Sequence, residues 1–345
     1  MREGAARRAQ HRNDRSAAAP DRAEVVVVSM HEDPIAVGVG ALTAAVLVLM
    51  AAPVPGFLDA GEFVAAAREL GVIHPPGHPG WLSLAGLAEL VPIGPIAARV
   101  AWFSACWAGV SAALIVRIGR RLLAAQAVTA AQGTAGALVA GLTLAASASL
   151  WLVGTRAEVY TLALASNLWA IDAALAAGST ASAGRRPERF AAMATVAVAL
   201  GLLNHHYLTL FALPAVLVAG WPALKTLHAS AGRWRWLVAT ALIMGLGYLA
   251  LPLRAVAGVE LRWGDPETLA GFWDHITAAY WQRSVSEGAA VTGGVFEGLG
   301  MLLFGVVDGL GVPLGALGLF GLIGAILRPS RPLVVAWLMV GGGLL

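Results

Sequence analysis

Charged residues are scarce in this sequence. Only 12% of its 345 residues are Asp, Glu, Lys or Arg, whereas 58% are hydrophobic and the mean hydropathy is +0.74. Soluble globular domains carry about twice that share of charged residues. The composition therefore excludes a soluble domain and predicts an integral membrane protein.

Cysteine and net charge are also low. The single cysteine, Cys106, lies in an apolar run, which excludes an internal disulfide and a cysteine metal cluster. The formal net charge is only +3, so the pI near 9.5 reflects arginine-rich loops better than a basic surface for nucleic acid. Membrane lipids are expected partners, and nucleic acid is not.

Apolar runs of about 17 to 25 residues, the length that crosses a bilayer, recur through most of the chain. They predict an all-α integral membrane protein, a multi-span helical bundle formed by a polytopic domain over residues 35–345. A tight turn is needed at Asn204, His205 and His206. The predicted spans are about 35–54, 97–116, 134–153, 157–177, 190–206, 207–224, 236–253 and 298–327.

The two ends of the sequence differ from this domain. Residues 1–34 are polar and rich in Arg and Ala, and the apolar run after them is too long for a signal peptide and lacks a small-residue cleavage site. We interpret them as a disordered cytoplasmic tail. The last apolar run, Leu333 to Leu345, is too short to cross a bilayer of about 30 Å, which predicts a chain truncated at its C-terminus.

The basic residues indicate an orientation. If the N-terminus is cytoplasmic, seventeen of the 23 Lys and Arg residues fall on the cytoplasmic side and six on the other. The positive-inside rule favours this arrangement, and we expect a bacterial inner (cytoplasmic) membrane protein. Two segments on the outer side, at about 55–95 and 258–297, are too long and polar to be simple turns. Function is expected there.

The first outer segment carries two carboxylates and two histidines. Asp59 and Glu62 open a predicted helix from Ala60 to Leu70, where they could form a capping box or could provide a catalytic base. His74 and His78 flank a proline-rich turn. The prolines exclude a shared helical face, so the two histidines have no clear metal geometry. A substrate contact and a structural turn are both favoured over metal binding, and all three alternatives remain open.

The motifs of this segment resemble those of a protein O-mannosyltransferase-like family of membrane proteins. The family pattern Asp-Ser-Gly-Glu-Phe, then His-Pro-Pro-Gly-Tyr-Pro, matches residues 59–63 and 74–79, except that Ala60 replaces the serine and His78 the tyrosine. The resemblance extends over roughly residues 35–330. It continues at Ala157-Glu158-Val159-Tyr160, Asn204-His205, Tyr248 to Ala255, and Trp263-Gly264-Asp265-Pro266 with Phe272, His275 and Tyr280.

The resemblance implies a helical bundle of GT-C type with a helical first outer loop that carries a catalytic carboxylate. It places this carboxylate at Asp59, as general base, with Glu62 as the second carboxylate. It also implies a lipid-phosphate sugar as donor. An inverting displacement needs a base for the incoming hydroxyl and positive charge for the departing phosphate.

Further polar residues at predicted outer span ends could bind the substrate or its phosphate, and Arg254 is the strongest choice among them. Snorkelling arginines, polar turns and an interfacial aromatic belt are the structural alternatives. No residue is assigned as a metal ligand, and a divalent metal is conceivable without support from the sequence. The candidates are His74, His78, Arg156, Glu158, His205, His206, Arg254, Asp265 and His275.

The function predicted from these residues is an inverting glycosyltransferase. It would transfer a sugar, mannose by analogy with the family, from a polyprenyl phosphate to a protein or glycan acceptor outside the cytoplasm. A transporter or flippase of lipid-linked substrates is one alternative, although no internal repeat supports it. A non-catalytic membrane module is the other, and it predicts that Asp59 is dispensable.

Overall fold

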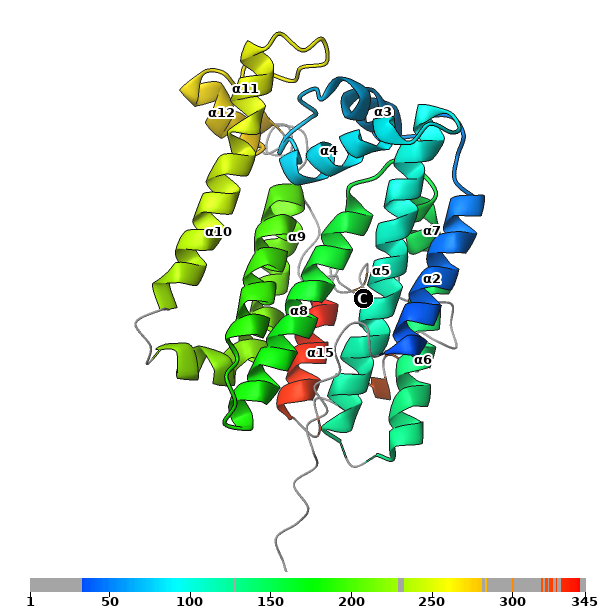
Figure 1. Ribbon diagram of the computed structural model, residues 1–345, viewed down its shortest axis with the longest axis vertical. Coiled ribbons are helices and arrows are strands. Elements are labelled where there is room, and N and C mark those ends of the chain that lie inside the picture. The colour runs from blue at the N-terminus through cyan, green and yellow to red at the C-terminus, as the bar shows by residue number, and fades with distance from the viewer. Residues whose placement is uncertain are drawn as a thin grey trace, which may run out of the picture.

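The structure, a computed structural model, describes residues 33–126, 128–228, 233–280 and 330–341, with isolated positions between 283 and 327. Long helices stand side by side in a bundle, and short helices gather at one end of it (Figure 1). The elements are α2 (Pro34–Leu49), α3 (Ala60–Glu69), α4 (Pro79–Ala85), η2 (Gly86–Leu90), α5 (Ile96–Ala124), α6 (Ala130–Ala146), α7 (Ala148–Gly154), α8 (Tyr160–Ser182), α9 (Glu188–His228), α10 (Arg233–Tyr248), α11 (Ala250–Val256), α12 (Leu269–Ile276) and α15 (Arg331–Gly341).

The predicted all-α membrane bundle is confirmed. Within the described residues, four helices are long and apolar enough to cross a membrane, or five if the bent pair α6 and α7 forms one span. The first predicted span corresponds to α2, which has only 16 residues. At 1.5 Å per residue it reaches roughly 24 Å, less than the hydrocarbon thickness of a typical bilayer.

The predicted span 134–153 is not one straight helix. It is divided into α6 and α7, which meet at an angle of 55°. Ser147 lies at the break in an extended conformation, and its hydroxyl donates to the Leu144 carbonyl and accepts from the Leu150 N–H. This side chain satisfies backbone groups that a continuous helix would pair internally.

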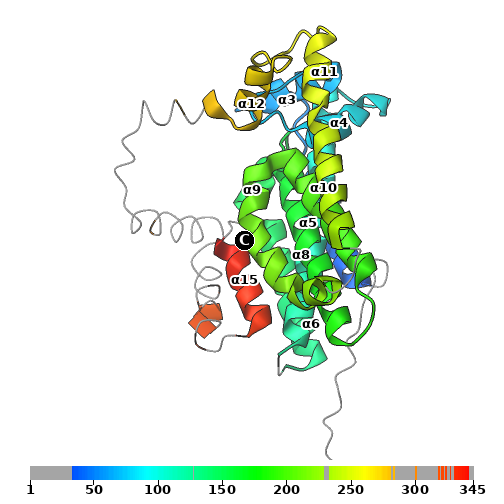
Figure 2. The same ribbon diagram turned by 90° about the vertical axis from the view of Figure 1, so that its left-hand side faces the viewer.

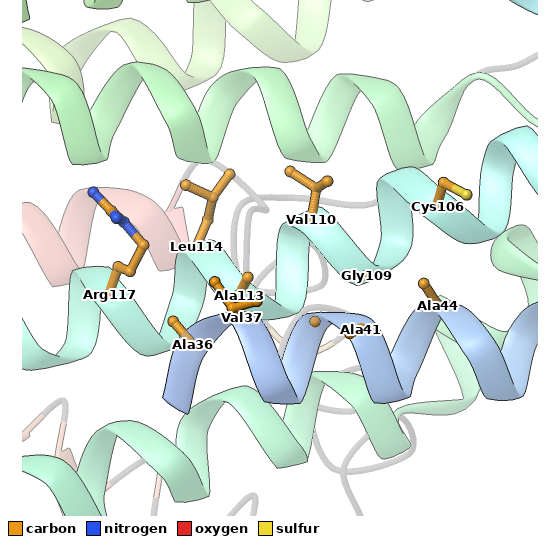
Figure 3. Close-up of a pocket in the computed structure, with 11 residues that line it drawn as sticks. Ala36, Val37, Ala41, Ala44, Cys106, Gly109, Val110, Ala113, Leu114 and Arg117 are labelled. Atoms are coloured by element: carbon orange, nitrogen blue, oxygen red, sulfur yellow. The ribbon is translucent and has the colours of Figure 1, made fainter. Parts of the chain in front are cut away.

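Small residues allow α2 to approach α5 closely. A Cβ added to Gly40 would lie 2.8 Å from the Gly109 carbonyl oxygen, and one added to Gly109 would lie 2.7 Å from the Ala44 Cβ. Such contacts are typical of helix pairs in membranes. A shallow groove of about 280 Å³ runs beside this contact, with Cys106 and Arg117 toward opposite ends (Figure 3).

The helix α9 reverses direction at His205, which has non-helical φ and ψ of −143° and 84°. A Cβ on Gly201 would lie 2.6 Å from Thr209 Oγ1, although eight residues of straight helix would separate them by about 12 Å. The two arms therefore run back along each other, joined at one end of the bundle (Figure 2). The tight turn predicted at Asn204 to His206 is present.

The end of the bundle that carries α3, α4, α11 and α12 is called here the cap end (Figures 1 and 2). The predicted helix from Ala60 to Leu70 is α3, which ends where Leu70 turns left-handed at φ 52°. An isolated parallel bridge joins Val72 to Arg262. This bridge connects the two segments in which function was expected, 55–95 and 258–297.

A charged network lies deeper in the bundle. Asp172 accepts from Arg117 at 2.8 Å and from Arg121 at 2.6 Å, and Asp33 pairs with Arg120 at 2.7 Å. The Asp172 side chain is only 4% exposed. Two arginines one helical turn apart on α5 face α8 and neutralise the carboxylate.

Three parts of the sequence prediction fall outside the described residues. They are the tail over residues 1–32, most of the outer segment beyond Tyr280, and nearly all of the predicted span 298–327.

Candidate active site

Asp59 stands at the first turn of α3, but its side chain does not cap the helix. The capping-box alternative is therefore wrong. Phe63, Ala66 and Ala67 bury one face of α3 against the cap end, and this packing leaves the Asp59 side chain 53% exposed on the other side. A carboxylate that is held by a buried helix and open to solvent can meet a substrate.

Glu62 turns toward His74 instead of toward its own helix terminus. Its Oε1 accepts the His74 backbone N–H at 2.7 Å, and its Oε2 lies 2.8 Å from His74 Nδ1. The other ring nitrogen, Nε2, lies 4.0 Å from Asp59 Oδ2. We call Asp59, Glu62 and His74 the carboxylate–histidine cluster. Their ligand atoms lie within 4.8 Å of one another.

The charge of this cluster depends on His74. Burial opposes protonation of the ring, but the hydrogen bond and negative charge of Glu62 outweigh burial and raise the pKa of His74 above its ordinary value. Asp59 adds a smaller effect in the same direction. The imidazole thus holds positive charge between two carboxylates more readily than a free histidine would.

The turn from His74 to His78 is fixed by its neighbours. Gly77 has φ +86°, and a Cβ there would lie 2.9 Å from His275 Nε2 and 3.0 Å from the Leu251 side chain. His78 is buried, and its Nδ1 contacts the Asn204 carbonyl of α9. Burial, with the nearby His205, lowers the pKa of His78 well below its usual value, so this ring is neutral and lies in the wall of the site.

His275 of α12 lies behind the same turn and is 3% exposed. Burial lowers its pKa to about 4, although a hydrogen bond with the Ile73 backbone opposes the shift. Asp265 behaves differently, because it is 72% exposed and pairs with Arg262 at 3.7 Å. The structure thus brings His275 against the His74 turn and leaves Asp265 at the surface.

Arg156 and Glu158 form a buried pair between α7 and α8. Arg156 Nε lies 3.3 Å from Glu158 Oε1, and the two side chains are 11% and 2% exposed. Ser104 of α5 holds the Glu158 backbone through bonds of 3.1 and 3.2 Å. Burial raises the pKa of Glu158 to about 7, against the effect of Arg156, and the charge on Asp59 raises it further. Glu158 is therefore electrostatically linked to the cluster.

The two adjacent histidines of α9 point to different neighbours. The His205 ring lies 5.2 Å from the His78 ring and 5.7 Å from the Tyr160 ring, measured between centroids. His206 Nδ1 instead lies 3.3 Å from the Tyr248 hydroxyl of α10. This separation agrees with the divergence expected of neighbouring positions, which disfavours a shared metal.

Arg254 reaches across the cap end from α11 to α4, where its Nη2 donates to Ser83 Oγ at 3.0 Å. Its Nη1 is buried and has no hydrogen-bond partner among the described residues. A buried guanidinium nitrogen without an acceptor is costly, so this group could accommodate an anionic oxygen.

Sequence reasoning missed Ser83 and Ser104. Ser83 accepts a hydrogen bond from Arg254, which lies 171 positions away in the sequence. Ser104 bonds to the backbone of Glu158, 54 positions away. Neither serine lies in a distinctive charged motif, so no local signal could have identified them. The pairing of Glu62 with His74 was also not predicted, because the capping pattern directed Glu62 to its own helix.

Part of the chain is similar to known proteins. Residues 59–222 match the family described as protein O-mannosyl-transferase TMEM260 N-terminal domain. Through this region the chain is similar to the protein O-mannosyltransferase-like family. The chain is also 30% identical over 224 residues to the mouse (Mus musculus) protein O-mannosyl-transferase TMEM260. No solved structure matches it.

The matches cover only part of each protein. The alignment with the mouse protein covers 63% of this chain and 30% of the mouse protein, so the chain spans less than a third of its relative. The family region contains the cluster, the Arg156–Glu158 pair and the α9 histidines. Arg254, Asp265 and His275 lie beyond its last residue, 222.

Proposed function

We propose that the protein is an inverting glycosyltransferase of GT-C type. It would take a sugar from a polyprenyl-phosphate donor and transfer it to a hydroxyl of a protein or glycan acceptor. The names of the relatives favour mannose and a protein acceptor. The cap end would face the non-cytoplasmic side of a bacterial inner membrane, with the N-terminus in the cytoplasm, as the distribution of basic residues favours.

One observation carries the proposal. Asp59 is a half-exposed carboxylate next to a buried set of polar residues at one end of an apolar bundle, where a lipid-borne substrate would meet a water-borne one. Its side chain is not used for helix capping, and it lies inside the family region. These facts support a chemical role for Asp59 over a structural one.

The reaction would proceed by direct displacement. The acceptor oxygen forms a bond to the anomeric carbon as the bond from that carbon to the phosphate oxygen breaks. The lipid phosphate leaves with the bonding electrons, and the hydroxyl proton passes to Asp59. A base in this position contributes about 10²- to 10⁴-fold to the rate.

The departing phosphate gains negative charge and needs positive partners. Arg254 is the best candidate, since its buried Nη1 has no acceptor among the described residues. Arg156 already pairs with Glu158, so it could contact a phosphate only while it also pairs with that carboxylate. His205 and His206 remain candidates for polar contacts with the donor.

The proposal is tested with the purified protein in lipid nanodiscs. Transfer from a polyprenyl-phosphate mannose to a serine- or threonine-containing peptide is measured for the wild type, Asp59→Asn and the matched control Glu69→Gln. Glu69 is an exposed carboxylate at the far end of the same helix. We expect a loss of about 10²-fold or more for Asp59→Asn only. Equal turnover by all three proteins would remove Asp59 from the reaction and favour a non-catalytic module.

A further inference from the structure

The carboxylate–histidine cluster contains a gap between two electron-pair donors. Glu62 Oε2 lies 2.8 Å from His74 Nδ1, and in the neutral ring a hydrogen bond there places the proton on Nδ1 and leaves a lone pair on Nε2, where a metal ion would displace the second proton. That lone pair and Asp59 Oδ2 are 4.0 Å apart, too far for a hydrogen bond.

We propose that Asp59 and His74 bind a divalent cation of the Mn²⁺ or Zn²⁺ type in this gap. Protein ligands lie about 2.0 to 2.2 Å from such ions, so a separation of 4.0 Å accommodates one ion between nitrogen and oxygen. A mixed imidazole and carboxylate set suits these ions better than Ca²⁺, which takes six to eight oxygen ligands.

Glu62 has the geometry of a supporting residue for such a site. Histidines that bind metals usually donate their second ring N–H to a carboxylate, which fixes the tautomer and the direction of the ring. Glu62 provides this contact and also accepts the His74 backbone N–H at 2.7 Å. The main chain and the ring of His74 are thus held by the same carboxylate, so Nε2 points toward Asp59 in a fixed direction.

The surroundings favour an ion with open coordination positions. Asp59 is 53% exposed, whereas His74 and Glu62 are 14% and 17% exposed. Two protein ligands leave coordination positions for water and for a phosphate oxygen of the donor. The phosphate contact rests on the proposed function. Asp59 would bind through Oδ2 and keep Oδ1 for the acceptor hydroxyl. The ion would then reduce the negative charge of the leaving phosphate.

The test measures binding of Mn²⁺ alone, without substrate. The protein is purified without a histidine tag and placed in nanodiscs, and free Mn²⁺ is followed by electron paramagnetic resonance. We expect one saturable site in the wild type and in Glu69→Gln. Asp59→Asn and His74→Gln should bind at least tenfold more weakly, and Glu62→Gln about 10- to 100-fold more weakly.

Several outcomes would overturn the cation site. The first is that the wild type shows no saturable binding of Mn²⁺. The second is that Asp59→Asn and His74→Gln bind Mn²⁺ as tightly as the wild type does. If His74→Gln does not fold, Asp59→Asn decides the result, because its side chain is half exposed. A protein that binds no Mn²⁺ and transfers sugar at full rate after chelation refutes the cation site but not the transferase. A protein that binds Mn²⁺ but transfers no sugar refutes the transferase alone.

Discussion

Replacing Asp172 tests how much the buried charge network stabilises the bundle. Asp172 is 4% exposed and bonds to Arg117 at 2.8 Å and Arg121 at 2.6 Å, which are themselves 8% and 14% exposed. The Asp172→Ala variant leaves both guanidinium groups without this carboxylate in a low-dielectric interior. Removal of one partner from a buried ion pair costs about 3 to 5 kcal/mol.

The expected change is large enough to measure by heating the detergent-solubilised protein and following tryptophan fluorescence. At about 2 to 3 °C per kcal/mol, the apparent midpoint should fall by roughly 6 to 15 °C. The matched control is Asp274→Ala, which removes an ion pair with Arg283 at 2.9 Å whose side chains are 58% and 62% exposed. This surface pair should contribute less than about 1 kcal/mol.

A third variant separates lost pairing from lost packing. Replacing Asp172 by Leu together with Arg117 and Arg121 by Met removes all three of these charges at once. Buried ion networks replaced by apolar side chains are often as stable as the original, so the midpoint should recover most of the loss. A midpoint for Asp172→Ala equal to that of Asp274→Ala would refute the assigned burial of this network.

Three further predictions concern the cap end. Glu158 has its pKa raised from 4.5 to about 7, so its bound proton stabilises the fold below pH 4.5 and that stability is lost as the pH rises through 7. From pH 5 to pH 8 the free energy of unfolding of the wild type should fall by about 2 kcal/mol more than that of Glu158→Gln, and parallel pH curves would contradict the assignment. Gly77→Ala places a Cβ 2.9 Å from His275 Nε2 at a position with positive φ, and it should lower the rate of sugar transfer at least tenfold. The control Gly184→Ala also has a positive φ but has open space around it, so it should leave the transfer rate unchanged. Arg254→Lys keeps the positive charge but loses the planar guanidinium with its several N–H donors, so it should raise the KM for the lipid donor. An unchanged KM would exclude Arg254 from donor binding.

The sequence predicted the membrane bundle and most of its spans because apolar runs of fixed length follow directly from bilayer thickness. It also predicted the turn at His205, since three polar residues cannot remain in hydrocarbon. It did not predict the break at Ser147, where one hydroxyl satisfies two backbone groups. A single serine within an apolar run gives no reason to interrupt a helix.

The candidate site was only partly predictable for a different reason. Asp59 and His74 were identified by their motifs, but the contact between Glu62 and His74 depends on how α3 packs against the turn. Asp59 and Glu62 form a sequence pattern that is equally typical of a helix start. Local spacing could not decide whether Asp59 caps the helix, whereas the structure shows that its side chain does not.

The reversal of α9 has a consequence for how related sequences could vary in length. Its two arms are joined at a single residue, with no loop to absorb a change in length. Insertion of one residue in either arm would rotate everything beyond it by about 100° and shift it by about 1.5 Å. In the arm before the turn, such a change would rotate His205 away from His78. Natural variants should therefore tolerate insertions beyond the ends of α9 but conserve the number of residues within each arm.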